Sequence, residues 1–217
     1  MIVANRNAAA AERVATALGA NARSVHADVT RPADVATMLD AAQAHFGGLH
    51  SLVNNAGIGH VPQPMEELAE DEFDRILAVN VKAIYLAERA VVPCFKQQNS
   101  GVILNIASTA GVSPRPRLTW CNASKGWVIT VTRSVAVELA SFGICVNALN
   151  PVAGETPLLK TFMGENAPEV RAKFLATIPR GRFSTPEDRG NAACFLCGDE
   201  ASMITGVAME VGGGRCI

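Results

Sequence analysis

The stretch "GVILNIAS", residues 101–108, decides the fold more clearly than any other part of the sequence. Its apolar residues run almost without interruption, whereas a strand with one face in water alternates apolar and polar residues. A near-continuous apolar run is typical of a parallel strand that is covered on both faces. We therefore expect helices on both sides of this strand.

The sequence on either side alternates between two kinds of segment. Short apolar runs predict further strands at residues 1–4, 22–28, 49–55, 144–151 and 206–211. Amphipathic segments predict helices at 7–19, 30–47, 70–98, 119–142 and 186–198, with two short helical pieces within 152–180. Such alternation indicates βαβ units with right-handed crossovers. We therefore expect one doubly wound, three-layer α/β domain over residues 1–217, with ligands beyond the carboxyl ends of its strands.

The composition excludes several classes of partner. The formal net charge is −1, which gives no sign of nucleic-acid binding, and no apolar run approaches the roughly 20 residues of a membrane span. The N-terminus lacks the residue order of a signal peptide, so we expect a cytoplasmic protein with reduced cysteines. Cys194 and Cys197 form a C-x-x-C pair without further ligands nearby, so we expect packing and no metal site.

A second stretch, "LTWCNASKGWVITVT" at 118–132, places Cys121 four residues before Lys125 on a predicted helix. Positions i and i+4 share a helix face, and a neighbouring ammonium lowers the pKa of a thiol. The spacing therefore raises the question of whether Cys121 is a catalytic nucleophile.

Polar and small residues follow the predicted strands in a recognisable order. They are "NNAG" at 54–57, Asn80 in "VNVKA", Ser108, "NASKG" at 122–126, "PVAGET" at 151–156 and the closing "ITGVAMEVGGG". Together, over essentially the whole chain, these motifs resemble the short-chain dehydrogenase/reductase family. The resemblance implies a Rossmann-like fold, NAD or NADP as cofactor, and hydride transfer between the nicotinamide and a small carbonyl or alcohol substrate.

The resemblance also implies roles for individual residues. Ser108 would hydrogen-bond the substrate oxygen, Lys125 would bind the nicotinamide ribose, and Asn80 would hold a helix kink and a water of the proton relay. The other implied cofactor contacts are Asp28 and Val29 at the adenine, Asn54, Ala56 and Gly57 near the adenosine ribose, and Pro151, Val152 and Thr156 near the carboxamide.

The family's catalytic Tyr-x-x-x-Lys is altered in this sequence. It reads Cys121-Asn122-Ala123-Ser124-Lys125, so a thiol stands in the place of the phenol. A cysteine sulfur reaches less far than a phenol oxygen, and a general acid must come within roughly 2.6–3.2 Å of its partner or act through one water. Cys121 is thus a nucleophile, a weakened acid or a chemically idle thiol, and the sequence leaves the three open.

The family's Gly-rich turn after a first strand is also absent, and the sequence opens at what resembles the family's second strand. We expect this to leave two strand edges unpaired or to make the first two strands shift inward. We also expect weak dinucleotide binding and reduced stability. Asn5 and Arg6 follow the 1–4 strand and leave the choice between NAD and NADP open.

The remaining expectations concern assembly and activity. His60 is expected on a solvated loop, and the apolar surface of helices 70–98 and 119–142 favours a homodimer or homotetramer. Two hypotheses follow. The first is an NAD(P)-dependent oxidoreductase with impaired activity, and the second is an inactive relative that only binds or oligomerises.

Overall fold

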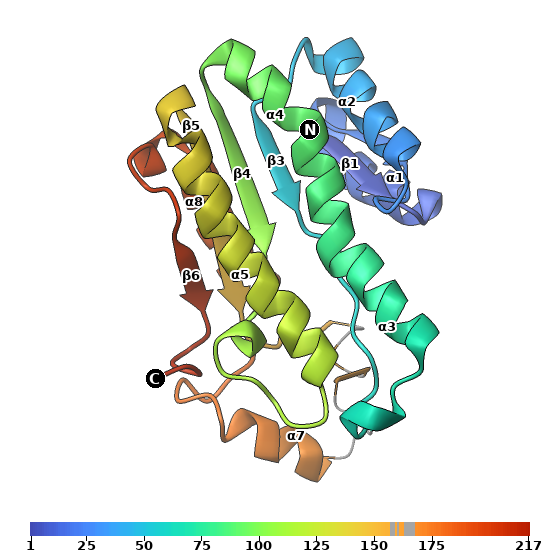
Figure 1. The fold of residues 1–217 in the computed structure, drawn as a ribbon, viewed down its shortest axis with the longest axis vertical. Coiled ribbons are helices and arrows are strands. Elements are labelled where there is room, and N and C mark those ends of the chain that lie inside the picture. The colour runs from blue at the N-terminus through green and yellow to red at the C-terminus, as the bar shows by residue number, and fades with distance from the viewer. Residues whose placement is uncertain (157–158, 160, 163–167) are drawn as a thin grey trace.

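The computed structural model describes residues 1–156, 159, 161–162 and 168–217, and it is an α/β fold of parallel strands and helices (Figure 1). The strands are β1 (Ile2–Asn5), β2 (Arg23–His26), β3 (Ser51–Asn54), β4 (Gly101–Ile106), β5 (Ile144–Pro151) and β6 (Ala208–Val211). The helices are α1 (Ala8–Leu18), α2 (Pro32–Phe46), α3 (Glu70–Leu77), α4 (Ala83–Gln98), α5 (Thr119–Leu139), α7 (Pro168–Leu175) and α8 (Pro186–Cys197). The second short helical piece expected within 152–180 falls partly outside the described residues.

The strand β4 is covered on both faces, as its apolar run predicts. Ile103 packs with Val91 and Phe95 of α4 in one buried cluster, whereas the next residue, Leu104, packs with Leu196 of α8 in another. Successive side chains of a strand point to opposite faces, so both faces of β4 are buried. Figure 1 shows α4 and α5 on one side of the strands and α8 on the other, which confirms the three-layer, doubly wound expectation.

The strands form two separate sheets. β1 pairs only with β2, and β3, β4, β5 and β6 form a four-stranded sheet in that order, among the residues that the structure describes. β1 and β3 thus each keep an edge without a strand partner. Of the two outcomes expected from the sequence, unpaired edges are the one observed. An unpaired edge exposes backbone groups that a neighbouring strand would otherwise satisfy.

Helix ends follow local sequence signals. The side chain of Asn7 accepts a hydrogen bond from the amide of Ala10 at the start of α1. Thr185 and Asp188 form a reciprocal capping box at the start of α8. The expected single helix over 70–98 is instead interrupted by a π-helical turn at Ala78–Lys82, which contains Asn80. Such turns relocate side chains within a helix and are frequent at functional sites. No helix in the described part of the chain is long and apolar enough to cross a bilayer.

Candidate active site

A cavity of about 400 Å³ lies where β3, β4 and β5 end. Its wall includes Gly57 and Ile58 after β3, Ser108 after β4, and Val152 after β5. Lys125, from α5, also lines it. The carboxyl ends of parallel strands are the usual ligand position in an α/β sheet, because loops from neighbouring strands meet there.

The approach of Ser108 to Lys125 depends on a glycine. A Cβ atom at Gly111 would lie 2.8–2.9 Å from backbone atoms of Lys125 and Gly126, closer than side chains tolerate. The turn that follows Ser108 therefore rests directly on the α5 backbone. The Ser108 hydroxyl oxygen accepts a hydrogen bond from the amide of Ala110 at 3.1 Å, so its proton remains available to donate into the cavity.

Lys125 brings a positive charge to the wall of this cavity. Its Nζ donates to the carbonyl oxygen of Ile106 at 2.8 Å. Burial lowers the pKa of Lys125 to about 8, and the neighbouring Cys121 partly opposes this shift. An ideal Cβ at Gly57 would lie 3.3 Å from the Lys125 Nζ, so the loop after β3 packs closely on the ammonium.

Asn80 joins three elements. Its side-chain oxygen accepts from the amide of Ile58 at 2.9 Å, and its nitrogen donates to the Ile58 carbonyl and to the Ser124 hydroxyl, each at 3.0 Å. The side chain is 1% exposed and does not line the cavity. Both amide hydrogens are used by protein partners, so Asn80 ties the loop after β3 to the π turn and to α5.

Cys121 is buried and does not line the wall of the cavity. Its sulfur is 3.9 Å from the Ile58 carbonyl oxygen, and the residue is 4% exposed. Burial raises the pKa of the Cys121 thiol, and the opposing charges of Lys125 and Arg115 do not reverse this. The lowered pKa that the i, i+4 spacing suggests is therefore not found, because desolvation outweighs the nearby ammonium.

The loop after β5 is fixed by backbone and serine contacts. The Val152 amide donates to the Val211 carbonyl at 3.1 Å, and the Ser184 hydroxyl donates to the Val152 carbonyl at 3.1 Å. Pro151, Val152 and Thr156 all line the cavity. The structure thus brings these three expected cofactor residues together with Ser108, Lys125 and Gly57.

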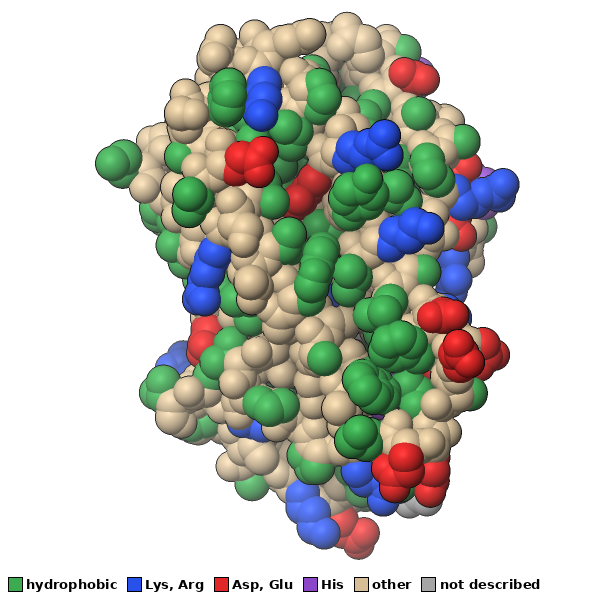
Figure 2. Space-filling view, in the orientation of Figure 1, with side chains coloured by type: hydrophobic (Ala, Val, Ile, Leu, Met, Phe, Trp, Pro, Cys, Tyr) green, Lys and Arg blue, Asp and Glu red, His purple; other side chains and the backbone are tan. Residues whose placement is uncertain are grey.

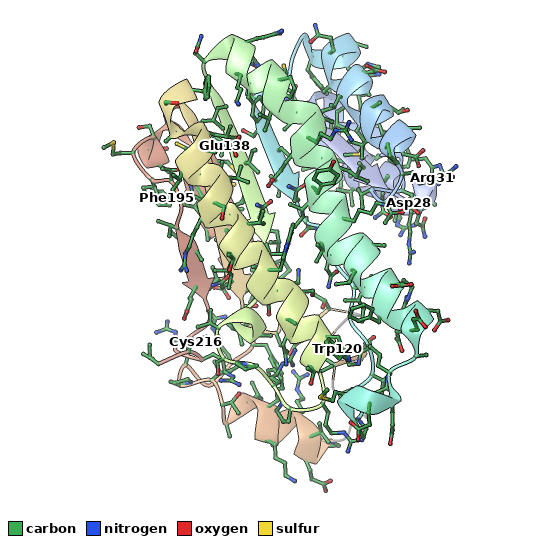
Figure 3. All side chains as sticks on the ribbon, viewed as in Figure 1. Asp28, Arg31, Trp120, Glu138, Phe195 and Cys216 are labelled. Carbon is green, nitrogen blue, oxygen red and sulfur yellow. The ribbon has the colours of Figure 1, made fainter. Side chains whose placement is uncertain are left out.

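The expected adenosine-side residues lie elsewhere. Asn5, Arg6, Asp28 and Val29 follow β1 and β2, and none of them lines the cavity. Figure 3 shows Asp28 and Arg31 beside the β1–β2 unit, whereas Trp120 marks the start of α5. Hydrogen bonds from Thr30 lower the pKa of the Asp28 carboxyl, with smaller contributions from Arg6 and Arg31.

Asn54 and Ala56 do not line the cavity either. The Asn54 side chain donates to that of Asn105 at 2.8 Å, which fixes the end of β3 against β4. This contact is internal to the sheet, so it positions the loop after β3 rather than offering a side chain to the cavity.

Several residues that line the cavity were not predicted from the sequence. Arg115, Arg189 and Arg215 line it, as do the aromatic rings of Phe162 and Phe174. None of these residues stands in a motif, so only the folded chain brings them together. The expectation that His60 lies on a solvated loop was wrong, because the residue is buried, with 2% of its surface exposed.

Comparison with known proteins places this geometry in a family. Residues 1–215 match a family model described as enoyl-(acyl carrier protein) reductase. The chain is 48% identical over 191 residues to 4-formylbenzenesulfonate dehydrogenase of Comamonas testosteroni, covering 88% of this chain and 76% of that protein. It is 38% identical over 212 residues to an inactive 2-(S)-hydroxypropyl-CoM dehydrogenase of Xanthobacter autotrophicus, covering 97% and 92%.

The fold agrees with that result. The structure of a 3-ketoacyl-(acyl-carrier-protein) reductase from Brucella melitensis in complex with NADH has a TM-score of 0.94 and 51% identity. That comparison covers 100% of this chain and 87% of the other. With matching motifs, matching topology and a cavity at the strand ends, the chain belongs to the short-chain dehydrogenase/reductase family of oxidoreductases.

Proposed function

We propose that this chain catalyses NAD(P)-dependent hydride transfer between the nicotinamide and a small carbonyl or alcohol substrate. The observation that carries the proposal is the convergence of the Ser108 hydroxyl and the Lys125 ammonium on one cavity at the strand ends. The 51% identical neighbour was solved with NADH, which supports the choice of cofactor class.

The nicotinamide half of the cofactor fits the residues present. Lys125 uses one N–H on the Ile106 carbonyl, and its other donors are available to ribose hydroxyls. Gly57 leaves room above the ammonium that a Cβ would fill. Val152 and Thr156 would meet the carboxamide. When bound, the nicotinamide supplies the hydride in the reducing direction and accepts it in the oxidising one.

Ser108 and Lys125 have distinct tasks in this proposal. Ser108 donates its hydroxyl proton in a hydrogen bond to the substrate oxygen, which orients the reacting carbon and stabilises negative charge on that oxygen. Lys125 has its pKa lowered to about 8, so it is protonated for most of the time at neutral pH and adds positive charge nearby. Asn80 acts through the Ile58 backbone and Ser124, as a positioning residue.

Among the described residues that line the cavity, there is no tyrosine to take the place of the family's catalytic one. The Cys121 sulfur lies against the Ile58 carbonyl outside the cavity wall, and its thiol has a raised pKa. We infer that the proton for the substrate oxygen comes from water and that Cys121 is chemically idle. Loss of a placed general acid typically lowers a rate by about 10²–10⁴-fold.

The test compares the wild-type chain with Cys121→Tyr in assays of NADH and NADPH oxidation over a panel of aldehydes and ketones. We expect slow turnover by the wild type and an increase of at least about 10²-fold in the variant. Cys194→Tyr, at an exposed position on α8 that does not line the cavity, is the matched control and should not change the rate. Absence of turnover in all three folded proteins would contradict the proposal.

A second candidate is an inactive relative that keeps its binding surface. It is favoured by the buried Cys121 and by the similarity to a protein named as inactive. It predicts no turnover even in Cys121→Tyr. The same experiment therefore separates the two candidates.

We also propose that the chain forms a homodimer or homotetramer through α4 and α5. Tyr85, Trp127 and Val137 on these helices are 51%, 36% and 84% exposed. Figure 2 shows hydrophobic side chains along the face that these two helices form. A cytoplasmic location is proposed with it, supported by six cysteines that are all free thiols.

A further inference from the structure

The wall of the cavity is strongly cationic. Three arginines and one lysine line it, namely Arg115, Arg189, Arg215 and Lys125. No aspartate or glutamate lines it among the residues that the structure describes. The nearest acidic residue in the loop after β5, Glu155, already forms an ion pair with Arg171. A partly buried cavity wall that carries several positively charged side chains attracts an anion.

The Arg115 guanidinium lies over two aromatic rings. Its guanidinium lies 4.9 Å from the ring centroid of Phe162 and 5.1 Å from that of Phe174. Cation–π contacts of this kind hold a guanidinium in place without an acceptor oxygen, so its N–H groups can still bind a ligand. No ion pair of this guanidinium with another described residue is found. Burial lowers the pKa of Arg115; the nearby Cys121 partly opposes this, and Arg215 lowers the pKa further.

Arg215 lies close enough to Arg115 to influence it and is itself oriented. Its Nη1 donates to the Ser113 hydroxyl at 2.9 Å, and Ser113 lines the same cavity. Arg189 adds a buried Nη2 that has no hydrogen-bond partner among the described residues. Donors of a guanidinium that are buried and unused cost free energy unless a ligand satisfies them.

Apolar side chains form a further part of the wall, beside polar ones such as Ser108, Ser113 and Thr156. Ile58, Val152 and Leu159 line the cavity together with the two aromatic rings. Its volume of about 400 Å³ is at the small end of the range for ligand sites, roughly 300–1,000 Å³. The same cavity would also take the nicotinamide proposed above, so the part left for substrate suits a small body with apolar surface and one anionic group.

We propose that Arg115 and Arg215 bind the carboxylate or sulfonate of an anionic substrate, while its carbonyl or hydroxyl carbon faces Ser108. A planar guanidinium recognises such oxyanions through two parallel N–H···O bonds. The placement of the reacting carbon rests on the function proposed above. The anion site itself does not, because its occupancy is measurable without turnover.

The test measures binding by titration calorimetry with two probes of nearly equal shape, 4-formylbenzoate and 4-formylbenzamide. Charge-assisted hydrogen bonds to two arginines predict that the benzoate binds about ten- to a hundredfold more tightly. Arg115→Gln and Arg215→Gln should each reduce this preference severalfold or more. Arg117→Gln, an exposed arginine of the same loop that does not line the cavity, is the matched control and should keep it.

Three results would overturn the inference. The first is equal affinity of the wild type for the two probes, including no binding of either. The second is a preference that survives in both arginine variants. The third is displacement of 4-formylbenzoate by saturating NADH, because the arginines would then serve the cofactor. Preferential binding without any hydride transfer would instead support the anion site while contradicting the proposed function.

Discussion

Replacing Glu88 by glutamine should stabilise the fold at pH 8 and leave it unchanged near pH 4.5. Glu88 lies on α4 and is 7% exposed. Its carboxylate accepts a hydrogen bond from Asn105 at 3.0 Å, and Asn105 also donates to Thr132 at 3.1 Å. Burial raises the pKa of Glu88 from its ordinary value of 4.5 to about 7, and the Asn105 bond only partly opposes this.

The sign of the effect follows from proton uptake. Between pH 4.5 and about 7 the folded chain holds a proton on Glu88 that the unfolded chain has released. Raising the pH through this window therefore favours the unfolded state, and the loss is complete above pH 7. A pKa shift of one unit corresponds to about 1.4 kcal/mol. The shift of Glu88 from 4.5 to about 7 therefore corresponds to a loss of about 3 kcal/mol in the free energy of unfolding. Glutamine keeps the acceptor for Asn105 and does not ionise.

The assay is urea unfolding of the wild type and Glu88→Gln from pH 4.5 to 8. The difference in free energy of unfolding should grow from about zero to about 1–3 kcal/mol in favour of the variant. Glu138→Gln is the control, because Glu138 is an exposed glutamate on α5 (Figure 3). If the difference in free energy of unfolding between the wild type and Glu88→Gln stayed constant from pH 4.5 to 8, the reasoning would be refuted.

Three further predictions concern packing, strand edges and the thiol. Gly111→Ala should destabilise the fold by about 1–3 kcal/mol in the same denaturation assay, because the added Cβ meets the α5 backbone. Gly190→Ala is the control, because this position on α8 faces open space, and it should be neutral or stabilising. Amide hydrogen exchange followed by mass spectrometry should be faster in β1 and β3 than in β4 and β5, and equal protection would show that the open edges are covered in solution. Cys121→Ser should leave the slow rate of NAD(P)H oxidation within about threefold of the wild type, and a loss on the scale of about 10²-fold would instead assign chemistry to the thiol.

The layers of the fold were predictable from sequence, because each depends on local pattern. The apolar run of β4 already required cover on both faces, and the expected strand at 144–151 coincides with β5. Asn7 and Thr185 are residue types that favour helix starts, and each does cap a helix by accepting a hydrogen bond from a backbone N–H. The family resemblance implied a helix kink at Asn80, but its form as a π turn was not predictable, because it depends on the hydrogen bonds of Asn80 with Ile58 and Ser124.

The site was only partly predictable. Ser108, Lys125, Gly57 and Thr156 follow strands or lie in a motif, and the fold brings them to one cavity. The exclusion of Cys121 from the cavity wall depends on how α5 packs against the loop after β3, which the sequence spacing does not reveal. Arg115, Arg189 and Arg215 come from segments far apart in the chain, so their convergence is a property of the tertiary structure alone.

The most direct test of the central claim is a fluorescence titration of the folded chain with NADH and NADPH. The account predicts saturable binding of at least one of them, with a Kd of roughly 1 mM or tighter. Lys125→Met, which removes the ammonium proposed to meet the nicotinamide ribose, should weaken that binding at least about tenfold. Circular dichroism would verify that both proteins are folded. No saturation by either cofactor in the folded wild type, or equal binding by Lys125→Met, would contradict the account.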